Sequence, residues 1–211
     1  MGETPSIKDI RKALGAPTKG KARDELKLSN YATKGDKFFD KKADAEASLE
    51  EDAKAIDVLQ DALYGSQCGA LLLVLQGIDT SGKDGTTKSV FKYTSPLGVR
   101  VNPFGRPTDI ELAHDYLWRI HKVTPRRGHI GVFNRSHYED VLVVKVRNMK
   151  PADEIERRYE QINQFEKHLV ENGVRVLKLM LHISKEEQGK RLRERLAEPD
   201  KRWKFNPGDL E

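Results

Sequence analysis

The sequence predicts an α/β protein built on a central parallel sheet. Three short apolar runs, ALLLVLQ (70–76), HIGVF (129–133) and VRVLKLMLHI (174–183), alternate with longer stretches of helical periodicity. A continuous apolar run of this length is typical of a strand that is buried on both faces. Strands that alternate with helices favour a parallel sheet covered by helices on its faces.

The composition is that of a chain with one sizeable domain and a highly charged surface. The 211 residues include 38 Lys and Arg and 33 Asp and Glu, a net charge of +5. This mild excess suits an anionic partner such as phosphate or nucleic acid, and equally an ordinary solvated surface. The single cysteine, Cys68, excludes an intrachain disulfide. With no membrane-length apolar run and no secretory signal, we expect a cytoplasmic protein without a membrane partner.

Residues 1–44 are polar and of mixed charge, and the core is expected over residues 45–211. The first segment is interpreted either as an extended arm that lies on the domain or on a neighbouring subunit, or as a partly disordered tail. A helix is predicted from Asp44 to Gly65. Its apolar face is expected at Leu49, Ala53, Ile56, Leu59 and Leu63.

The rest of the chain continues the alternation. A helix from Asp84 to about Tyr93 follows the first strand, and a basic helix carrying Leu192 and Leu196 comes last. A long helix between them ends at Asn172-Gly173. The spacing also predicts one helix marked by Ile110, Ala113, Leu117 and Ile120, and the long helix is marked by Ile155, Tyr159, Ile162, Phe165 and Leu169.

The stretch GIDTSGKDGTT (77–87) nearly matches the phosphate-loop pattern G-x-x-x-x-G-K-[ST]. It lies between a predicted strand and a predicted helix, as that motif requires. Backbone N–H groups at a helix N-terminus bind anions, and the lysine adds a point charge. We therefore predict phosphate binding by Gly77, Thr80, Ser81, Gly82, Lys83, Asp84, Gly85 and Thr86.

Two carboxylates in this loop need an explanation. Asp84 stands where a Ser or Thr should hold magnesium. As a structural residue, Asp84 would complement the helix dipole by roughly 0.3–1 kcal/mol. Thr86 or Thr87 could supply the missing hydroxyl, but only in a shifted register. Asp79 would be repelled by a phosphate charge about 4 Å away by about 4 kcal/mol at an effective dielectric of 20. Mg²⁺ reverses that sign, so Asp79 is a candidate metal ligand or acceptor-orienting group; the alternative is a turn residue bonded to its own loop.

The second strand ends in FNRSHYEDV (133–141). Asn134 stands where a nucleotide-hydrolysing protein usually carries a Walker-B aspartate, and the acids Glu139 and Asp140 come later. Arg135 lies at the carboxyl end of the strand, where open α/β sheets bind ligands. Its guanidinium either grips phosphate or forms a salt bridge with Glu139.

Three further segments carry arginines. Arg106 in NPFGRPTD and Arg119 in WRIHK either contact the ligand or form ion pairs. In KRLRERLAEPDKRWKF (190–205), Arg191 and Arg195 share a helix face, where like charges cost roughly 0.2–0.5 kcal/mol. An anionic ligand would remove that cost, so this segment is interpreted as a lid over phosphates or as a solvated basic helix. Pro199 ends the helix, and Lys201, Arg202 and Lys204 follow it.

Together, GIDTSGKDG, FNRSHYEDVLV, HDYLWRIH and WKFNPGDL resemble stretches of the polyphosphate kinase 2 family, over roughly residues 25–211. The resemblance implies a thymidylate-kinase-like P-loop kinase fold, a three-layer αβα arrangement with a basic helical lid over about residues 185–207. It also implies reversible, Mg²⁺-dependent phosphoryl transfer between inorganic polyphosphate and AMP or ADP, giving ADP or ATP. Mn²⁺ is a candidate substitute for Mg²⁺, and a homodimer or homotetramer is expected.

The resemblance also assigns residues. Asp79, as the metal ligand, and Lys83 are the functional residues of the loop, and Arg135 and Glu139 complete the catalytic set. Asn134 with Glu139 is most similar to the subgroup that accepts both AMP and ADP. The nucleotide is expected at Arg106, Arg119, Asn134, Arg135 and Glu139, and polyphosphate at the loop and at Arg191, Arg195, Lys201 and Lys204.

Two other functions remain open at this stage. An ATP-dependent nucleoside monophosphate kinase would share the fold, and donor preference separates it from a polyphosphate enzyme. A polyanion- or nucleic-acid-binding module without turnover would fit the charge, although no RNA-recognition or helix-turn-helix signature indicates a specific nucleic acid. Members of the resembled family continue beyond NPGDL, so we expect this chain to be C-terminally truncated.

Overall fold

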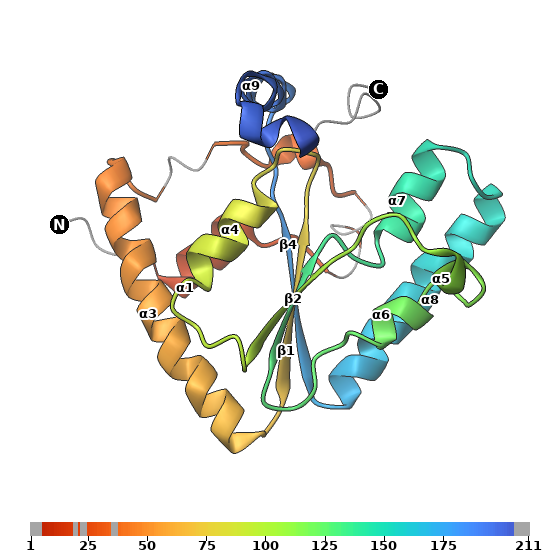
Figure 1. Ribbon diagram of the computed structural model, residues 1–211, viewed down its shortest axis with the longest axis horizontal. Helices are drawn as coiled ribbons and strands as arrows, with labels where there is room; N and C mark the ends of the chain where they lie inside the picture. The colour runs from red at the N-terminus through yellow and green to blue at the C-terminus, as the bar shows by residue number, and fades with distance from the viewer. Residues whose placement is uncertain (1–5, 19–20, 22–24, 35–37, 205–211) are drawn as a thin grey trace. The chain divides into compact units, whose positions relative to one another are not determined.

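The computed structural model describes residues 6–18, 21, 25–34 and 38–204 (Figure 1). The chain divides into two compact units. The first contains residues 1–52, 78–81 and 182–211, and the second contains residues 53–77 and 82–181. Within the described ranges, no helix combines the length and the apolar character that a membrane crossing requires.

The second unit is built on a four-stranded sheet in which every neighbouring pair is parallel. Its strands are β1 (Ala70–Gln76), β2 (Val99–Pro103), β3 (Ile130–Asn134) and β4 (Val174–Met180), in the order β2-β3-β1-β4. In the register of β1, Leu75 lies beside Asn134, so the carboxyl ends of β1 and β3 are neighbours. The predicted α/β fold with a parallel sheet is confirmed.

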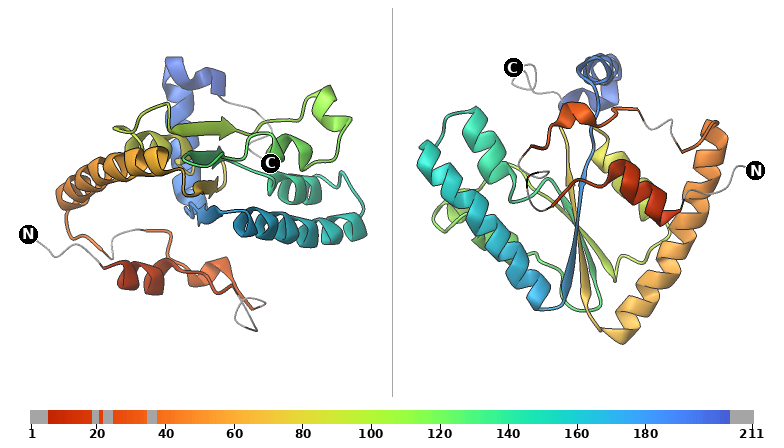
Figure 2. Two further views of the ribbon diagram at one scale, coloured as in Figure 1. Left: turned by 90° about the horizontal axis from the view of Figure 1, so that it is seen from below. Right: turned by 180° about the vertical axis from the view of Figure 1, so that it is seen from behind.

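Alternate residues of β1 face opposite sides of the sheet, and each side has its own core. Leu72 and Val74 pack with Phe104, Ile120, Phe133 and Leu169, whereas Leu73 and Leu75 pack with Ile130 and Val132. Figures 1 and 2 show the helices that cover these faces. On one side lie α4 (Lys83–Val90) and the part of α3 (Lys42–Ser66) that follows Asp52; on the other lie α6 (Trp118–His121) and α8 (Ala152–Glu171).

The prediction of one helix over Ile110–Ile120 is wrong, because two short helices occupy the segment. A capping box starts α5 (Asp109–Leu112): the Thr108 hydroxyl accepts the Glu111 N–H and the Glu111 carboxylate accepts the Thr108 N–H. Before α6, the carboxylate of Asp115 accepts the N–H of Leu117 at 2.9 Å. A side chain that takes a backbone donor in this way competes with the helix, so the helix does not continue across Asp115.

The predicted apolar face of α3 is only partly correct. Ala53 is fully buried and Leu63 packs against the sheet, but Leu59 is 67% exposed. Gln60 is buried instead, and its side-chain carbonyl accepts the N–H of Ser95 at 3.1 Å. Spacing alone could not distinguish the neighbouring positions, since the hydrogen bond to residue 95 is a tertiary contact.

One more helix of the second unit and four of the first complete the described elements. The second unit adds α7 (Glu139–Val146), which packs on α8. The first unit contains α1 (Ile7–Leu14), η1 (Leu28–Asn30), α9 (Lys185–Ala197) and η2 (Pro199–Lys204). The end of the expected lid, residues 205–207, and the side chains of Lys201 and Lys204 lie outside the described residues.

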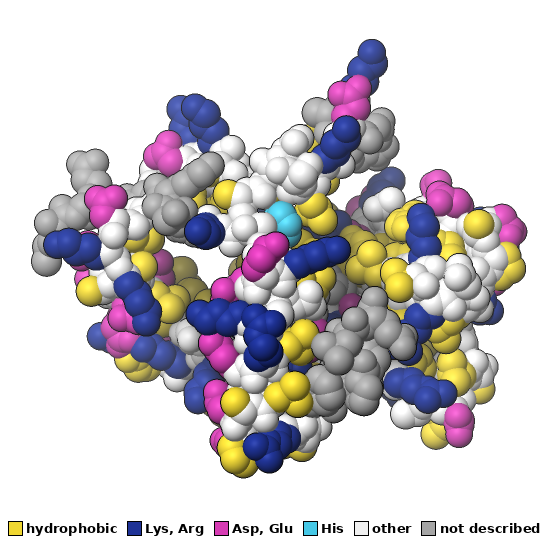
Figure 3. All heavy atoms as spheres, turned by 90° about the horizontal axis from the view of Figure 1, so that it is seen from above, with side chains coloured by type: hydrophobic (Ala, Val, Ile, Leu, Met, Phe, Trp, Pro, Cys, Tyr) yellow, Lys and Arg dark blue, Asp and Glu magenta, His cyan; other side chains and the backbone are white. Residues whose placement is uncertain are grey.

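The charged surface is mixed in sign. On the face drawn in Figure 3, Lys and Arg side chains are interspersed with Asp and Glu side chains, as the nearly balanced composition leads one to expect. A ligand site must therefore be identified from particular residues and not from the overall charge.

Candidate phosphate-binding site

The two ends of the phosphate loop, Gly77 and the residues from Gly82 onward, belong to the second unit. Gly82 caps α4 with a φ of 101°, a left-handed conformation that favours glycine. Lys83 opens the helix and is 8% exposed, and its ammonium donates to the carbonyl of Gly77 at 2.8 Å. The Thr87 hydroxyl donates to the Lys83 carbonyl at 3.0 Å. Lys83 follows Gly82 in the chain and its ammonium binds Gly77, so the side chain links the two ends of the loop.

The tip of the loop, residues 78–81, belongs to the first unit. Thr80 has a φ of 60°, which is uncommon for a residue with a branched side chain. Its hydroxyl oxygen is buried and has no hydrogen-bond partner among the described residues. Strained backbone and unsatisfied buried polar atoms are concentrated at functional sites. Both features therefore favour a ligand at Thr80, as the sequence predicts.

Helix α9 binds this tip through side chains of its own unit. Arg195 Nη1 lies 2.7 Å from Asp79 Oδ2, and Arg191 Nη1 donates to the Thr80 carbonyl at 3.0 Å. The amide of Gln188 donates to the carbonyl of Asp79 at 3.4 Å. The structure thus brings together Asp79, Thr80 and the two predicted lid arginines. In this arrangement a guanidinium neutralises Asp79, which is one answer to the presence of a carboxylate in an anion-binding loop.

The second loop acid has a different partner. Asn134, at the end of β3, donates its side-chain N–H to Asp84 Oδ1 at 2.6 Å. Asp84 lies in the first turn of α4, so this hydrogen bond ties the loop helix to the neighbouring strand. The bond brings Asp84, a predicted phosphate-binding residue, beside Asn134, a predicted nucleotide-binding residue, and it gives Asp84 a role besides its interaction with the helix dipole.

Arg135 follows β3 with a φ of 63°, and its N–H donates to the carbonyl of Leu75 at 3.0 Å. Glu139 begins α7, and both side chains are half-buried. No ion pair joins Arg135 to Glu139 in the part of the chain that the structure describes. The salt bridge considered as an alternative for Arg135 is therefore absent, which favours its availability to an anion.

Arg119 and Arg106 differ in their surroundings. Arg119 is buried, donates to the Gly105 carbonyl at 3.1 Å and lies 3.3 Å from an Asp140 carboxylate oxygen. Burial raises the pKa of Asp140, and the Arg119 guanidinium opposes that effect. Arg106 is exposed in the loop after β2. The ion-pair alternative thus describes Arg119 in this structure, and nucleotide contact by either arginine stays a prediction.

Sequence reasoning missed a buried polar network beneath residues 135–139. Glu166 of α8 is its centre, with His137, Tyr138 and Lys178 around it. One signal was available: Glu166 follows Ile162 by four residues and precedes Leu169 by three, so it lies on the buried face of its helix. A carboxylate on such a face requires hydrogen-bonding partners.

The residues present fit a magnesium ion only as a site with few protein ligands. The described residues contain no group of three His, Cys, Asp or Glu side chains that could enclose a metal. Mg²⁺ usually keeps several waters and takes one or two carboxylates together with substrate phosphates. Asp79, with 23% of its side chain exposed, fits that pattern once Arg195 moves from it.

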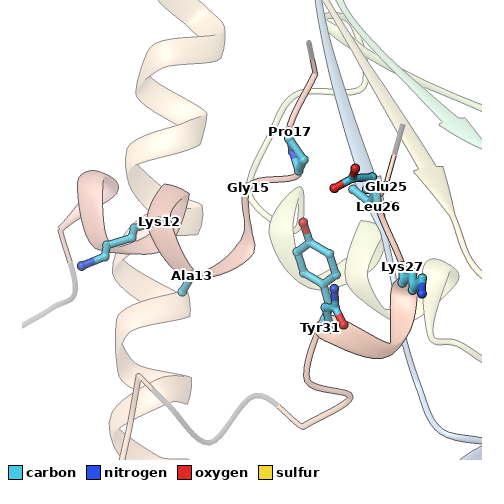
Figure 4. Close-up of a pocket in the computed structure, with 9 residues that line it drawn as sticks. Lys12, Ala13, Gly15, Pro17, Glu25, Leu26, Lys27 and Tyr31 are labelled. Carbon is cyan, nitrogen blue, oxygen red and sulfur yellow. The ribbon is translucent and has the colours of Figure 1, made fainter. Parts of the chain in front are cut away.

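A separate pocket of about 400 Å³ lies in the N-terminal segment of the first unit (Figure 4). Its lining comes from residues 12–31 and includes Pro17, Glu25 and Tyr31. In Figure 4 the Lys12 side chain points away from the space bounded by these three residues. None of the predicted site residues lines it, and its mixed charges do not indicate a particular ligand.

In this parallel sheet a phosphate loop follows strand β1, and a buried lysine stands at the start of the next helix. These features define a P-loop kinase-like protein. The comparisons with known proteins then identify the family. The family model described as "Polyphosphate kinase 2 (PPK2)" matches residues 39–211. The chain belongs to the polyphosphate kinase 2 family, as the sequence resemblance predicts.

Individual relatives agree with this assignment. An "AMP/ADP-polyphosphate phosphotransferase" of Meiothermus ruber is 52% identical over 158 residues, which cover 75% of this chain and 59% of that protein. An "ADP-polyphosphate phosphotransferase" of Rhodopseudomonas palustris is 39% identical over 200 residues, 89% of this chain and 69% of that protein. The crystal structure of polyphosphate kinase 2 from Arthrobacter aurescens TC1 superposes with a TM-score of 0.84 at 42% identity, covering 88% of this chain and 68% of that one. The chain thus spans about three fifths to two thirds of the length of these relatives.

Proposed function

We propose that this protein transfers a phosphoryl group between inorganic polyphosphate and AMP or ADP. In the forward direction, an acceptor phosphate oxygen attacks the terminal phosphorus of polyphosphate. The new P–O bond gives ADP or ATP, the terminal phosphoanhydride bond breaks, and polyphosphate leaves one unit shorter. The observation that carries the proposal is the loop at the end of β1, in which the buried Lys83 ammonium spans the loop at 2.8 Å from Gly77, in a chain of this family.

The chain's own residues are assigned as follows. Lys83 and the N–H groups at the start of α4 bind and orient phosphate oxygens, and Arg135 stabilises charge that develops during transfer. Arg191 and Arg195 hold polyphosphate from α9. Asn134 and Glu139 contact the nucleotide and favour acceptance of both AMP and ADP. Asp79 would hold Mg²⁺, which when bound neutralises charge between donor and acceptor phosphates.

Several expectations belong to the same proposal. The relatives' names support polyphosphate and adenine nucleotides as substrates. A homodimer or homotetramer, a cytoplasmic location and the use of Mn²⁺ in place of Mg²⁺ follow from the sequence interpretation and remain predictions.

The test is phosphoryl transfer to AMP and to ADP in Mg²⁺, with polyphosphate or ATP as the donor. We expect turnover with polyphosphate, reduced by roughly 10²–10³-fold in Lys83→Ala because a preorganised positive charge is removed. Lys88→Ala, an exposed lysine on the same helix, is the matched control and should retain activity. ATP as the only effective donor would instead indicate a nucleoside monophosphate kinase. Tight polyphosphate binding without turnover would indicate a binding module.

A further inference from the structure

The turn that carries Arg135 and Glu139 rests on two fully buried residues. Ser136 and His137 are both 0% exposed, although they lie between two half-buried residues proposed to contact substrate. The Ser136 hydroxyl accepts the side-chain N–H of Gln76 at 2.9 Å and the N–H of Tyr138 at 3.1 Å. Buried side chains therefore fix the turn, and its conformation depends on the residues that bind those side chains.

Glu166 of α8 binds both residues that follow Ser136. Its Oε1 lies 3.1 Å from His137 Nε2 and accepts the Tyr138 hydroxyl at 2.8 Å. Its Oε2 accepts the Lys178 ammonium at 2.6 Å, and Lys178 also donates to the Tyr138 oxygen at 3.0 Å. A single carboxylate on α8 thus joins the turn after β3 to a lysine on β4.

The electrostatics agree with an ionised carboxylate at the centre. Burial alone would raise the pKa of Glu166, but hydrogen bonds from His137 and Lys178 outweigh it and lower the pKa to about 2. Burial raises the pKa of the Tyr138 hydroxyl to about 12, with the Glu166 charge adding to the effect. The Tyr138 hydroxyl therefore remains a donor to Glu166 throughout the neutral range.

We propose that Glu166 is a positioning residue for phosphoryl transfer. It touches no proposed substrate contact directly. By fixing His137 and Tyr138 it sets the backbone on both sides of them, and hence the placement of Arg135 and Glu139. The left-handed φ of 63° at Arg135 is a conformation that the surroundings must impose, which is consistent with a turn held by its neighbours. This inference rests on the proposed function only for its kinetic test.

The kinetic test compares Glu166→Gln with wild type. The substitution keeps the size of the side chain and removes the charge that pairs with Lys178. A small misplacement of reacting groups can cost about 10²-fold, so we expect kcat/KM for the nucleotide to fall roughly 10- to 100-fold. The KM for polyphosphate should stay within about twofold. Glu156→Gln, an exposed glutamate on the same helix, should change neither value. A rise in the KM for polyphosphate as large as the loss in kcat/KM for the nucleotide would indicate a general structural role and overturn the proposal.

A second readout needs no turnover. The Glu139 N–H donates to the Ser136 carbonyl at 3.1 Å and the Asp140 N–H to the His137 carbonyl at 3.2 Å. In Glu166→Gln, hydrogen exchange of residues 136–141 should accelerate at least tenfold while α4 keeps its protection. If Glu166→Gln does not fold, Tyr138→Phe, which removes one of the hydrogen bonds to Glu166, takes its place with the same expectation.

The two readouts separate this inference from the proposed function. A wild-type chain without phosphoryl transfer would contradict the proposed function, and the exchange measurement alone would then decide the role of Glu166. Unchanged exchange over residues 136–141 would overturn the inference whatever the activity.

Discussion

Charged side chains on the buried face of α8 decide much of the local architecture around the candidate site. Arg158 and Glu166 are both nearly fully buried there. Arg158 donates to the Asp140 carbonyl at 2.9 Å and pairs with Glu154 at 2.7 Å, and Glu166 pairs with Lys178. A buried charge is tolerated when it is paired and hydrogen-bonded. The hydrogen bond to Asp140 connects α8 with α7 and the pair with Lys178 connects it with β4, so these two contacts stabilise particular positions of those elements.

The Arg119–Asp140 pair gives a first prediction. Asp140→Ala should destabilise the fold by about 3–5 kcal/mol, because it removes the nearer carboxylate of the buried Arg119 guanidinium, at 3.3 Å, and leaves it with that of Glu111 at 4.0 Å. Urea unfolding followed by circular dichroism measures the change. Asp153→Ala, which breaks the exposed pair with Arg157, is the control and should have little measurable effect. A similarly small effect at Asp140 would show that the buried pair contributes little to stability.

The lowered pKa of Glu166 predicts how stability depends on pH. The ordinary value of 4.5 applies to the unfolded chain, and the folded value is about 2. Because the folded pKa is the lower one, the contribution is fully present above about pH 4.5 and is lost as the pH falls towards 2. The difference in unfolding free energy between wild type and Glu166→Gln should therefore be largest near neutral pH and shrink at pH 3. A difference that grows on acidification would contradict this assignment.

At the level of single elements, the sequence predicted the helices and strands that have strong periodicity. The prediction failed where side chains accept hydrogen bonds from backbone N–H groups. The strands over 70–76, 130–134 and 174–180 and the long helix α8 lie where the apolar pattern places them. The prediction for segment 109–121 was wrong because Thr108 caps the start of α5 and Asp115 accepts a backbone N–H just before α6, and a spacing pattern does not contain such hydrogen bonds. Burial of Gln60 in place of Leu59 has the same origin, a tertiary hydrogen bond.

The cap of α9 gives an element-scale prediction. The Ser184 hydroxyl accepts the N–H of Glu187 at 3.2 Å, at the start of the helix that carries Arg191 and Arg195. Ser184→Ala should destabilise α9 by about 1 kcal/mol. We expect faster hydrogen exchange over residues 185–197 and a several-fold rise in the KM for polyphosphate. Ser184→Asp retains a capping oxygen and should restore both values; failure to do so would mean that Ser184 acts other than as a cap.

At the scale of the whole molecule, the sequence predicted which segments matter but not how the sheet arranges them. The order β2-β3-β1-β4 makes β1 and β3 neighbours, and this places Asn134 within 2.6 Å of Asp84 although 50 residues separate them in the chain. Within the first unit, Arg195 and Asp79 are likewise in contact although 116 residues separate them in the chain. Such contacts depend on topology, which one sequence does not determine, whereas the phosphate loop is local and could be recognised from its own residues.

Ligand binding gives the last prediction, which concerns the stability of the chain as a whole. A ligand that binds only the folded state stabilises it by about 2.7 kcal/mol at a hundred times its Kd. For a chain of 150–250 residues this corresponds to a rise in Tm of roughly 5–11 °C. We expect such a rise with polyphosphate at low ionic strength. It should be much smaller in 1 M NaCl, where the Debye length is about 3 Å, because the proposed contacts are ionic. The double substitution Arg191→Ala/Arg195→Ala should reduce the rise, whereas Lys167→Ala and Lys190→Ala, whose lysines lie in exposed helical ion pairs, should not. A Tm rise that is insensitive to both salt and the arginines would mean that polyphosphate binds elsewhere on the protein.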